Sequence, residues 1–136
     1  MPFIVRWPGR VQPGVSDALV SLMDLAASFA ALTGQKIPAH GAPDSIDVLP
    51  ALLGDSKNGL EKLVEHDGAR VLALRDGLWK LIEPERRKNA ALPPFSELYN
   101  LGDDLGEKNN LHASQPEKSK ALSDELDKER RAGFQK

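Results

Sequence analysis

Apolar and polar positions alternate most clearly between residues 70 and 82, where two β-favouring runs flank Asp76 and Gly77. An Asp-Gly pair between such runs is a strong hairpin signal, because glycine accepts the positive φ that a two-residue turn requires. In the first run, Leu72 and Leu74 point to one face of the predicted hairpin and the residues between them to the other. One face is more apolar, and an isolated hairpin is only marginally stable in water. We therefore expect further strands or a helix to cover that face.

Candidates for this cover lie on both sides of the hairpin. Residues 63–68 predict a strand that leads into it, and residues 96–101 predict a fourth strand. Pro116 in a first helical turn and Gly133 after the last turn predict a final helix, in which two leucines four residues apart form an apolar stripe. The pattern of residues 55–136 thus predicts an α+β fold, with about four antiparallel strands and a packed C-terminal helix.

The first third of the chain predicts one strand and one helix. Residues 3–7 form a nearly continuous apolar run, which is typical of a strand buried on both faces. Ser21 and Asp24 fit a capping box, apolar residues then recur at helical spacing, and Gly34 follows as a left-handed cap. The spacing predicts a helix over 22–33. We interpret Asp24 as a capping group and not as an acid catalyst.

Composition narrows the class of protein. A chain of 136 residues, with 40% hydrophobic and 28% charged residues, is typical of an ordinary globular domain. The longest apolar window, 18–32, contains Asp24 and is too short and too polar for a membrane span. No basic and apolar leader follows Met1, so no secretory signal is predicted, and the compartment stays open.

Charge and cysteine content exclude several chemistries. The 18 lysines and arginines nearly balance 20 acids and are scattered, so no basic face for nucleic acid is expected. The absence of cysteine excludes disulfides, thiolate nucleophiles and cysteine zinc sites. The histidines, His40, His66 and His112, have no ligand-like spacing, so no intrinsic metal site is predicted.

A few residues are candidates for ligand contact. His66 lies between Glu65 and Asp67, but strand alternation places those two acids on the face opposite to the histidine, which weakens a proton-relay interpretation. Arg86 and Arg87 lie in a charged, proline-rich excursion and are candidates, with His66, to contact an anionic substrate.

The acids of the loop after the fourth strand invite a calcium interpretation. Asp103, Asp104 and Glu107 do not follow the alternating oxygen spacing of an EF-hand loop. We interpret them as turn formers.

The order and spacing of these segments resemble the C-terminal part of the sulfatase family, within the alkaline-phosphatase superfamily. The likeness is greatest to bacterial arylsulfatase-like enzymes and covers nearly the whole chain. The segments that carry it are 2–9, 21–26 with 31–34, 48–54, 72–82 and 97–111.

The resemblance implies a division of the chain. Residues 1–54 would be the tail end of a large α/β domain, with its strand at 3–7 and its helix at 22–33. Residues 55–136 would be the C-terminal subdomain, a four-stranded antiparallel sheet with a terminal helix. The N-terminal catalytic part of the sulfatase would then be the partner of this chain.

The resemblance also implies that the chemistry lies elsewhere. Sulfatases use formylglycine, made from a Cys or Ser, together with calcium held by Asp and Asn side chains. In the family these groups precede the matched stretch, so no catalytic or metal residue is carried over to this chain. We expect the chain to be inactive alone, with a sulfated small molecule or glycan as substrate of the full enzyme.

Two alternatives stay open at this point. The chain could be a free-standing, non-catalytic binding or assembly module with the same fold, or part of a phosphatase or phosphodiesterase of the same superfamily. Independent folding would distinguish a free-standing module from a sulfatase fragment. A fragment would expose apolar side chains of 3–7 and of the 22–33 helix and would self-associate, whereas a module would be monodisperse.

Overall fold

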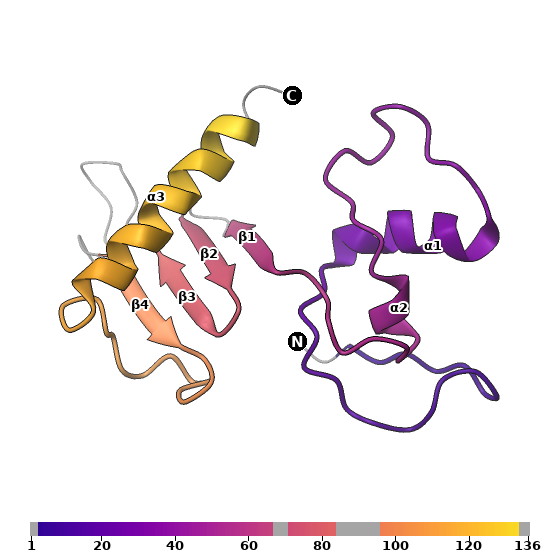
Figure 1. Cartoon of the computed structure of the whole chain (residues 1–136), viewed down its shortest axis with the longest axis horizontal. Helices are drawn as coiled ribbons and strands as arrows, with labels where there is room; N and C mark the ends of the chain where they lie inside the picture. Colours follow the sequence, from indigo (N-terminus) through magenta and orange to yellow (C-terminus); the bar gives the residue numbers. More distant parts are fainter. Residues whose placement is uncertain (1–2, 67–70, 84–95, 134–136) are drawn as a thin grey trace. The chain divides into compact units, whose positions relative to one another are not determined.

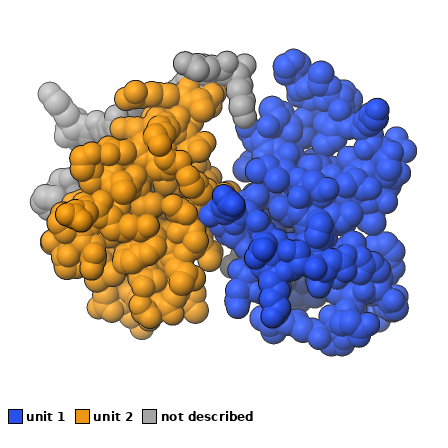
Figure 2. Space-filling view, viewed as in Figure 1, with its two compact units in different colours: residues 1–61 blue, residues 62–136 orange. Residues whose placement is uncertain are grey.

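The computed structural model describes residues 3–66, 71–83 and 96–133. The chain divides into two compact units, Met1–Glu61 and Lys62–Lys136 (Figure 2). Among the described residues, no helix combines the length and apolar character needed to cross a membrane.

The first unit is built around a capped helix. A 3-10 turn, η1 (Leu22–Asp24), continues into α1 (Leu25–Thr33) (Figure 1). The Ser21 hydroxyl accepts a hydrogen bond from the Met23 N–H at 3.3 Å, and the Asp24 carboxylate accepts one from the Ser21 N–H at 3.0 Å. Gly34 ends the helix with a φ of 65°. The predicted helix and its capping box are confirmed.

A polar segment after the helix ties α1 to the short helix α2 (Leu49–Leu52). The Ser45 hydroxyl accepts a hydrogen bond from the Ala27 N–H at 2.9 Å and donates one to the Met23 carbonyl at 2.7 Å. Ala27 lies in the first turn of α1, whose N–H groups have no partner within the helix. Ser45 therefore caps α1 from a loop distant in sequence.

Gly59 permits a close approach between two segments of the first unit. The Leu60 N–H donates a hydrogen bond to the Leu19 carbonyl at 2.7 Å. A Cβ added at Gly59 would lie 2.1 Å from that same carbonyl oxygen. An Asn-Gly pair is typical of turns, but Asn58 and Gly59 form none here. Glycine is required at this position because of a tertiary contact.

The strand predicted at 3–7 is not formed. Within the described ranges, these residues belong to no strand and pair with none. Phe3 and Trp7 are each 44% exposed. A strand exists only with a hydrogen-bonded neighbour, and an apolar run predicts burial without supplying that neighbour. The predicted strand belongs to a larger sheet, and that 3–7 pairs with further strands there stays a prediction.

The second unit is an antiparallel sheet with one helix across a face (Figure 1). Its strands follow the chain order β1-β2-β3-β4. Their bounds are β1 (Lys62–His66), β2 (Leu72–Asp76), β3 (Trp79–Ile82) and β4 (Glu97–Asn100), and the helix is α3 (Pro116–Gly133). The predicted α+β fold, with four strands and a terminal helix, is confirmed.

The core of the second unit is a row of leucines across the sheet. Leu74 pairs with Leu81, which pairs with Leu98, and all three are 0% exposed. Leu122 and Leu126, four residues apart on α3, are 2% and 0% exposed and complete this cluster. The helical stripe predicted from the sequence covers the face predicted to need it.

The hairpin turn lies one residue later than the Asp-Gly pair suggests. Asp76 pairs with Trp79, so that Gly77 and Leu78 form the connection. Gly77 has a φ of 58°. A type II′ turn takes glycine at its first central position, so the same glycine serves a turn shifted by one residue.

A buried carboxylate joins the end of β3 to α3. Glu83 is 7% exposed, and its carboxylate accepts hydrogen bonds from the Ser123 hydroxyl at 3.0 Å and the Arg130 guanidinium at 2.5 Å. A charged group in such a position is tolerated because charged and polar partners satisfy it. These two hydrogen bonds attach the end of β3 to α3.

Candidate functional site

The predicted substrate contacts lie partly outside the described residues. His66 is the last residue of β1, pairs with Leu72 and is exposed. Arg86 and Arg87 lie outside the described ranges, as does Asp67. His66 and Glu65 are successive strand residues and so point to opposite faces, as the sequence predicts. That His66 contacts a substrate stays a prediction.

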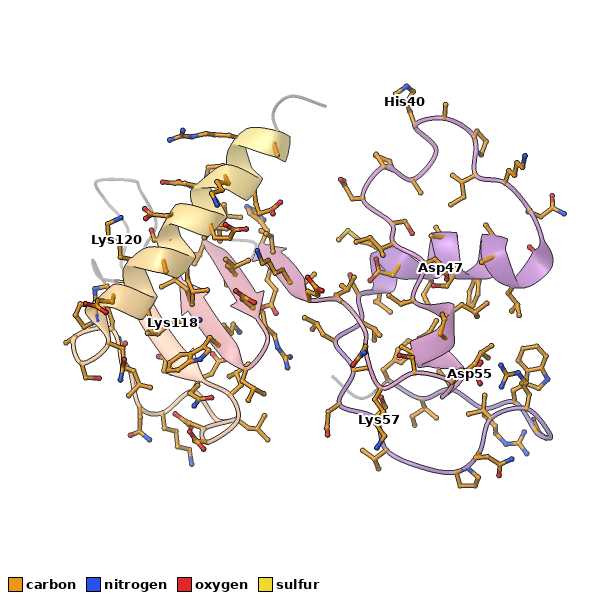
Figure 3. All side chains as sticks on the ribbon, in the orientation of Figure 1. His40, Asp47, Asp55, Lys57, Lys118 and Lys120 are labelled. Atoms are coloured by element: carbon orange, nitrogen blue, oxygen red, sulfur yellow. The ribbon has the colours of Figure 1, made fainter. Side chains whose placement is uncertain are left out.

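The position of His40 bears on the prediction about metal sites. It lies at the tip of the loop that follows α1, away from Asp47 and Asp55 (Figure 3). Within the described part of the chain, no group of three or more His, Cys, Asp or Glu side chains could hold a metal ion.

A polar cluster occupies the sheet face opposite to α3. Lys80 lies 2.8 Å from the Glu107 carboxylate and 3.4 Å from that of Glu65. The Tyr99 hydroxyl donates a hydrogen bond to Glu97 at 2.7 Å. The register places these side chains on one face, because Lys80 pairs with Tyr99 and their neighbours alternate.

The protonation states of this cluster argue against acid–base chemistry. Burial and then the Glu97 carboxylate raise the pKa of Tyr99 to about 12, so the phenol stays neutral. Burial alone would lower the pKa of Lys80, but Glu107 and Glu65 outweigh it and raise that pKa. A general base or an amine nucleophile needs its pKa near the working pH. Both shifts move the pKa further from neutral pH.

Glu107 takes part in a turn through its backbone, and its side chain makes an ion pair. Its N–H donates a hydrogen bond to the Asp104 carbonyl at 3.2 Å, while its carboxylate pairs with Lys80. Asp104 does form the turn, because its carboxylate accepts hydrogen bonds from the Lys108 and Asn109 N–H groups at 2.7 and 2.8 Å. Asp103 accepts one from the Asn100 amide at 2.7 Å. The Lys80 pair escaped sequence reasoning because the loop that supplies Glu107 is 27 residues away.

Further cationic contacts lie on the α3 side of the sheet. The Lys118 ammonium lies 5.6 Å from the centre of the Trp79 ring, as the position of Lys118 on α3 allows (Figure 3). Glu125 pairs with Lys62 at 2.5 Å and with Lys128 at 2.7 Å. The Lys62 and Lys118 contacts join β1 and β3 to the helix, whereas the Lys128 pair lies within α3.

The Glu125 contacts predict a pH dependence. Hydrogen bonds from Lys128 and then Lys62 lower the pKa of Glu125 from 4.5 to about 2. A lowered pKa contributes stability that is present above pH 4.5 and is lost as the pH falls toward 2. Carboxyl-carbon NMR should give a Glu125 midpoint near 2, and Lys62→Met should raise it. A wild-type midpoint at 4.5 would contradict the two contacts.

Large apolar side chains are exposed along η1 and α1. Leu22, Phe29 and Leu32, here called the outer stripe, recur at helical spacing and are 58%, 54% and 40% exposed. Large apolar side chains gathered on one exposed surface mark interaction sites.

Comparison with known proteins identifies the family. The sequence is 38% identical, over 135 residues, to an N-acetylgalactosamine-6-O-sulfatase of Bacteroides thetaiotaomicron, and the match covers 93% of this chain and 26% of that protein. It is 33% identical to human arylsulfatase A over 132 residues, which are 81% of this chain and 25% of that protein. No family model matches the sequence.

A solved structure agrees with these matches. It comes from work on glycosaminoglycan metabolism by Bacteroides thetaiotaomicron and aligns with a TM-score of 0.82 at 38% identity, over 93% of this chain and 28% of that chain. The chain belongs to the sulfatase family. It corresponds to the C-terminal part of sulfatases and spans about a quarter of the length of the curated relatives it matches.

A more distant sulfatase-like fold supports only the architecture. A structure solved in complex with its substrate D-glucosamine-2-N,6-O-disulfate aligns with a TM-score of 0.69 at 20% identity. The sequence has no cysteine, which is one of the two residues from which formylglycine is made.

Proposed function

We propose that this chain is the C-terminal part of a sulfuric-ester hydrolase that acts on a sulfated sugar. The observation that carries the proposal is the 38% identity to an N-acetylgalactosamine-6-O-sulfatase across 93% of the chain. The matched relatives are sulfatases, which favours a sulfatase over a phosphatase or a free-standing module. The nucleophile and the calcium ligands would come from the rest of the polypeptide.

The proposal assigns a role to each unit. The Met1–Glu61 unit would be the end of the larger α/β domain, and the Lys62–Lys136 unit the subdomain that closes it. His66, exposed at the end of β1, would lie at the rim of the substrate cleft with Arg86 and Arg87. Neither unit would perform the chemistry alone.

The test compares the 136-residue chain with a longer polypeptide in which the catalytic part of a sulfatase precedes it. Both would be incubated with 6-sulfated N-acetylgalactosamine and with its 6-phosphate analogue, and the released anion measured. We expect sulfate release from the longer polypeptide only. Sulfate release by the short chain above a buffer control, or faster hydrolysis of the phosphate ester, would contradict the proposal.

A variant of the longer polypeptide tests the predicted rim contact. His66→Ala should raise KM roughly two- to tenfold, the worth of about one hydrogen bond, and leave kcat unchanged. Lys57→Ala, at an exposed basic position of the first unit, is the matched control. Equal KM values for the wild type and His66→Ala would remove His66 from the substrate site.

A further inference from the structure

A short segment closes the outer edge of β4. The N–H of Leu98 in β4 donates a hydrogen bond to the Asn110 side-chain oxygen at 3.1 Å, and the Leu98 carbonyl accepts one from the Leu111 N–H at 2.8 Å. An edge strand with free N–H and C=O groups pairs readily with other chains. Residues 110–112, here called the edge cover, occupy those groups of Leu98. Leu111 also packs against the leucine cluster of the second unit.

A hydrogen bond between two side chains ties the edge cover to α3. The Asn110 side-chain oxygen also accepts a hydrogen bond from the His112 N–H at 2.9 Å, which holds the backbone of the cover. The His112 ring nitrogen Nδ1 lies 2.6 Å from the Ser119 hydroxyl oxygen. Ser119 belongs to α3 and is 3% exposed. This contact, here called the latch, therefore connects the cover to a buried position of the helix.

The surroundings of Ser119 decide which atom donates in the latch. A buried hydroxyl that loses its acceptor costs free energy. Among the described residues, the only hydrogen-bond partner of the Ser119 hydroxyl is Nδ1 of His112. The Gln115 carbonyl, one turn earlier in the chain, accepts a hydrogen bond from the backbone N–H of Ser119 at 3.0 Å and none from the hydroxyl. The hydroxyl therefore donates to Nδ1, and His112 is neutral with its proton on Nε2.

We propose that the latch is a pH-sensitive contact that holds the edge cover closed only while His112 is neutral. Histidine takes up a proton between about pH 5 and 8, which sets the range of the switch. The proton binds the lone pair of Nδ1 and turns this acceptor into a donor, so the hydrogen of the buried Ser119 hydroxyl is left without an acceptor. The contribution of the latch is therefore present at alkaline pH and is lost as the pH falls.

The carboxylates on the elements next to His112 are bound elsewhere. Glu97 of β4 accepts a hydrogen bond from a tyrosine hydroxyl. In the loop before the edge cover, Asp103 accepts one from an asparagine amide, Asp104 accepts backbone N–H groups, and Glu107 pairs with a lysine. Within the described ranges, no ion pair includes His112. A proton on the ring therefore gains no carboxylate partner.

The start of α3 also disfavours a cation at His112. The N-terminal end of a helix carries a partial positive charge, and α3 begins four residues after His112. Its first turn contains Glu117 and Lys118, and the preceding loop contributes Lys108. Glu117 is exposed, so its charge is screened by solvent, and the Lys118 ammonium lies 5.6 Å from the centre of the Trp79 ring.

The first experiment identifies the tautomer of His112. Long-range proton–nitrogen NMR spectra of the 136-residue chain would be recorded above about pH 8, where an imidazole is neutral. We expect an unprotonated Nδ1 and a protonated Nε2 in His112, whereas the exposed His40 and His66 should each show a mixture of tautomers. A proton on Nδ1 of His112 at this pH would overturn the proposal.

The second experiment measures opening of the edge cover by amide hydrogen exchange, corrected for the intrinsic effect of pH on exchange. Protection of the Leu98 and His112 N–H groups, which both bond to Asn110, should fall roughly fivefold between about pH 8 and pH 5, the worth of about one hydrogen bond. The Leu81 N–H, in the centre of the sheet, is the internal control and should keep its protection. Equal protection of Leu98 and His112 at the two pH values would overturn the proposal.

Two variants separate the titration of His112 from a loss of packing. His112→Asn keeps an acceptor oxygen close to the position of Nδ1 but does not titrate, so protection of the Leu98 N–H should stay high at both pH values. Ser119→Ala removes the hydroxyl, so that protection should be low at both. A fall in protection between the two pH values that persists in either variant would show that another group titrates and would overturn the proposal.

Discussion

Leu126→Ala is expected to destabilise the second unit by about 2–5 kcal/mol, the range found for truncating a fully buried leucine. Leu126 lies on α3, is 0% exposed and packs against Leu74, Leu81 and Leu98 of the sheet. The substitution removes apolar contacts and leaves a cavity between the helix and the sheet. A loss of that size is a large fraction of the stability of a small domain.

Trp79 fluorescence during urea unfolding can measure this loss. Trp79 packs against the leucine cluster, and Trp7→Phe removes the other tryptophan of the chain. Leu105→Ala is the matched control, because Leu105 is 85% exposed and should change stability by less than about 0.5 kcal/mol. Equal unfolding midpoints for Leu126→Ala and Leu105→Ala would contradict the packing of α3 on the sheet.

Gly59→Ala is expected to destabilise the first unit by about 1–3 kcal/mol from overpacking. The added Cβ would lie 2.1 Å from the Leu19 carbonyl oxygen, which is backbone and cannot rotate away as a side chain could. The two segments must separate, and the hydrogen bond from Leu60 to Leu19 would lengthen or break. That loss adds roughly 1 kcal/mol.

Hydrogen exchange of the first unit, or Trp7 fluorescence in a Trp79→Phe background, measures the effect. Gly14→Ala is the control, since a Cβ at Gly14 meets nothing within 4 Å. We expect Gly14→Ala to be neutral or slightly stabilising, because alanine restricts the unfolded chain. Unchanged exchange in Gly59→Ala would mean that the Leu19 and Leu60 segments are not in contact.

The family was predictable because the segments that carry it are local. The capped helix, the hairpin and the terminal helix each depend on residues close in sequence, and their order over the chain resembles sulfatases. The comparisons confirm that resemblance. The same locality limits the functional conclusion, since the match covers only about a quarter of the length of the curated relatives.

The candidate contacts were less predictable. The alternation of β1 places His66 and Glu65 on opposite faces without knowledge of the fold. The ion pair of Lys80 with Glu107 was not predicted, because it joins β3 to a loop beyond β4. The sequence around Glu107 indicates only a turn.

The sequence by itself determined the helices α1 and α3, the four strands and the leucine stripe that covers the sheet, because hydrophobic periodicity and capping residues act within a few positions. Only the tertiary structure decided the unpaired state of 3–7, the need for glycine at Gly59 and the exposure of the outer stripe. Each of these depends on which distant segment lies alongside. A residue pattern can state that a side chain prefers burial, but the partner that buries it is set by the whole polypeptide.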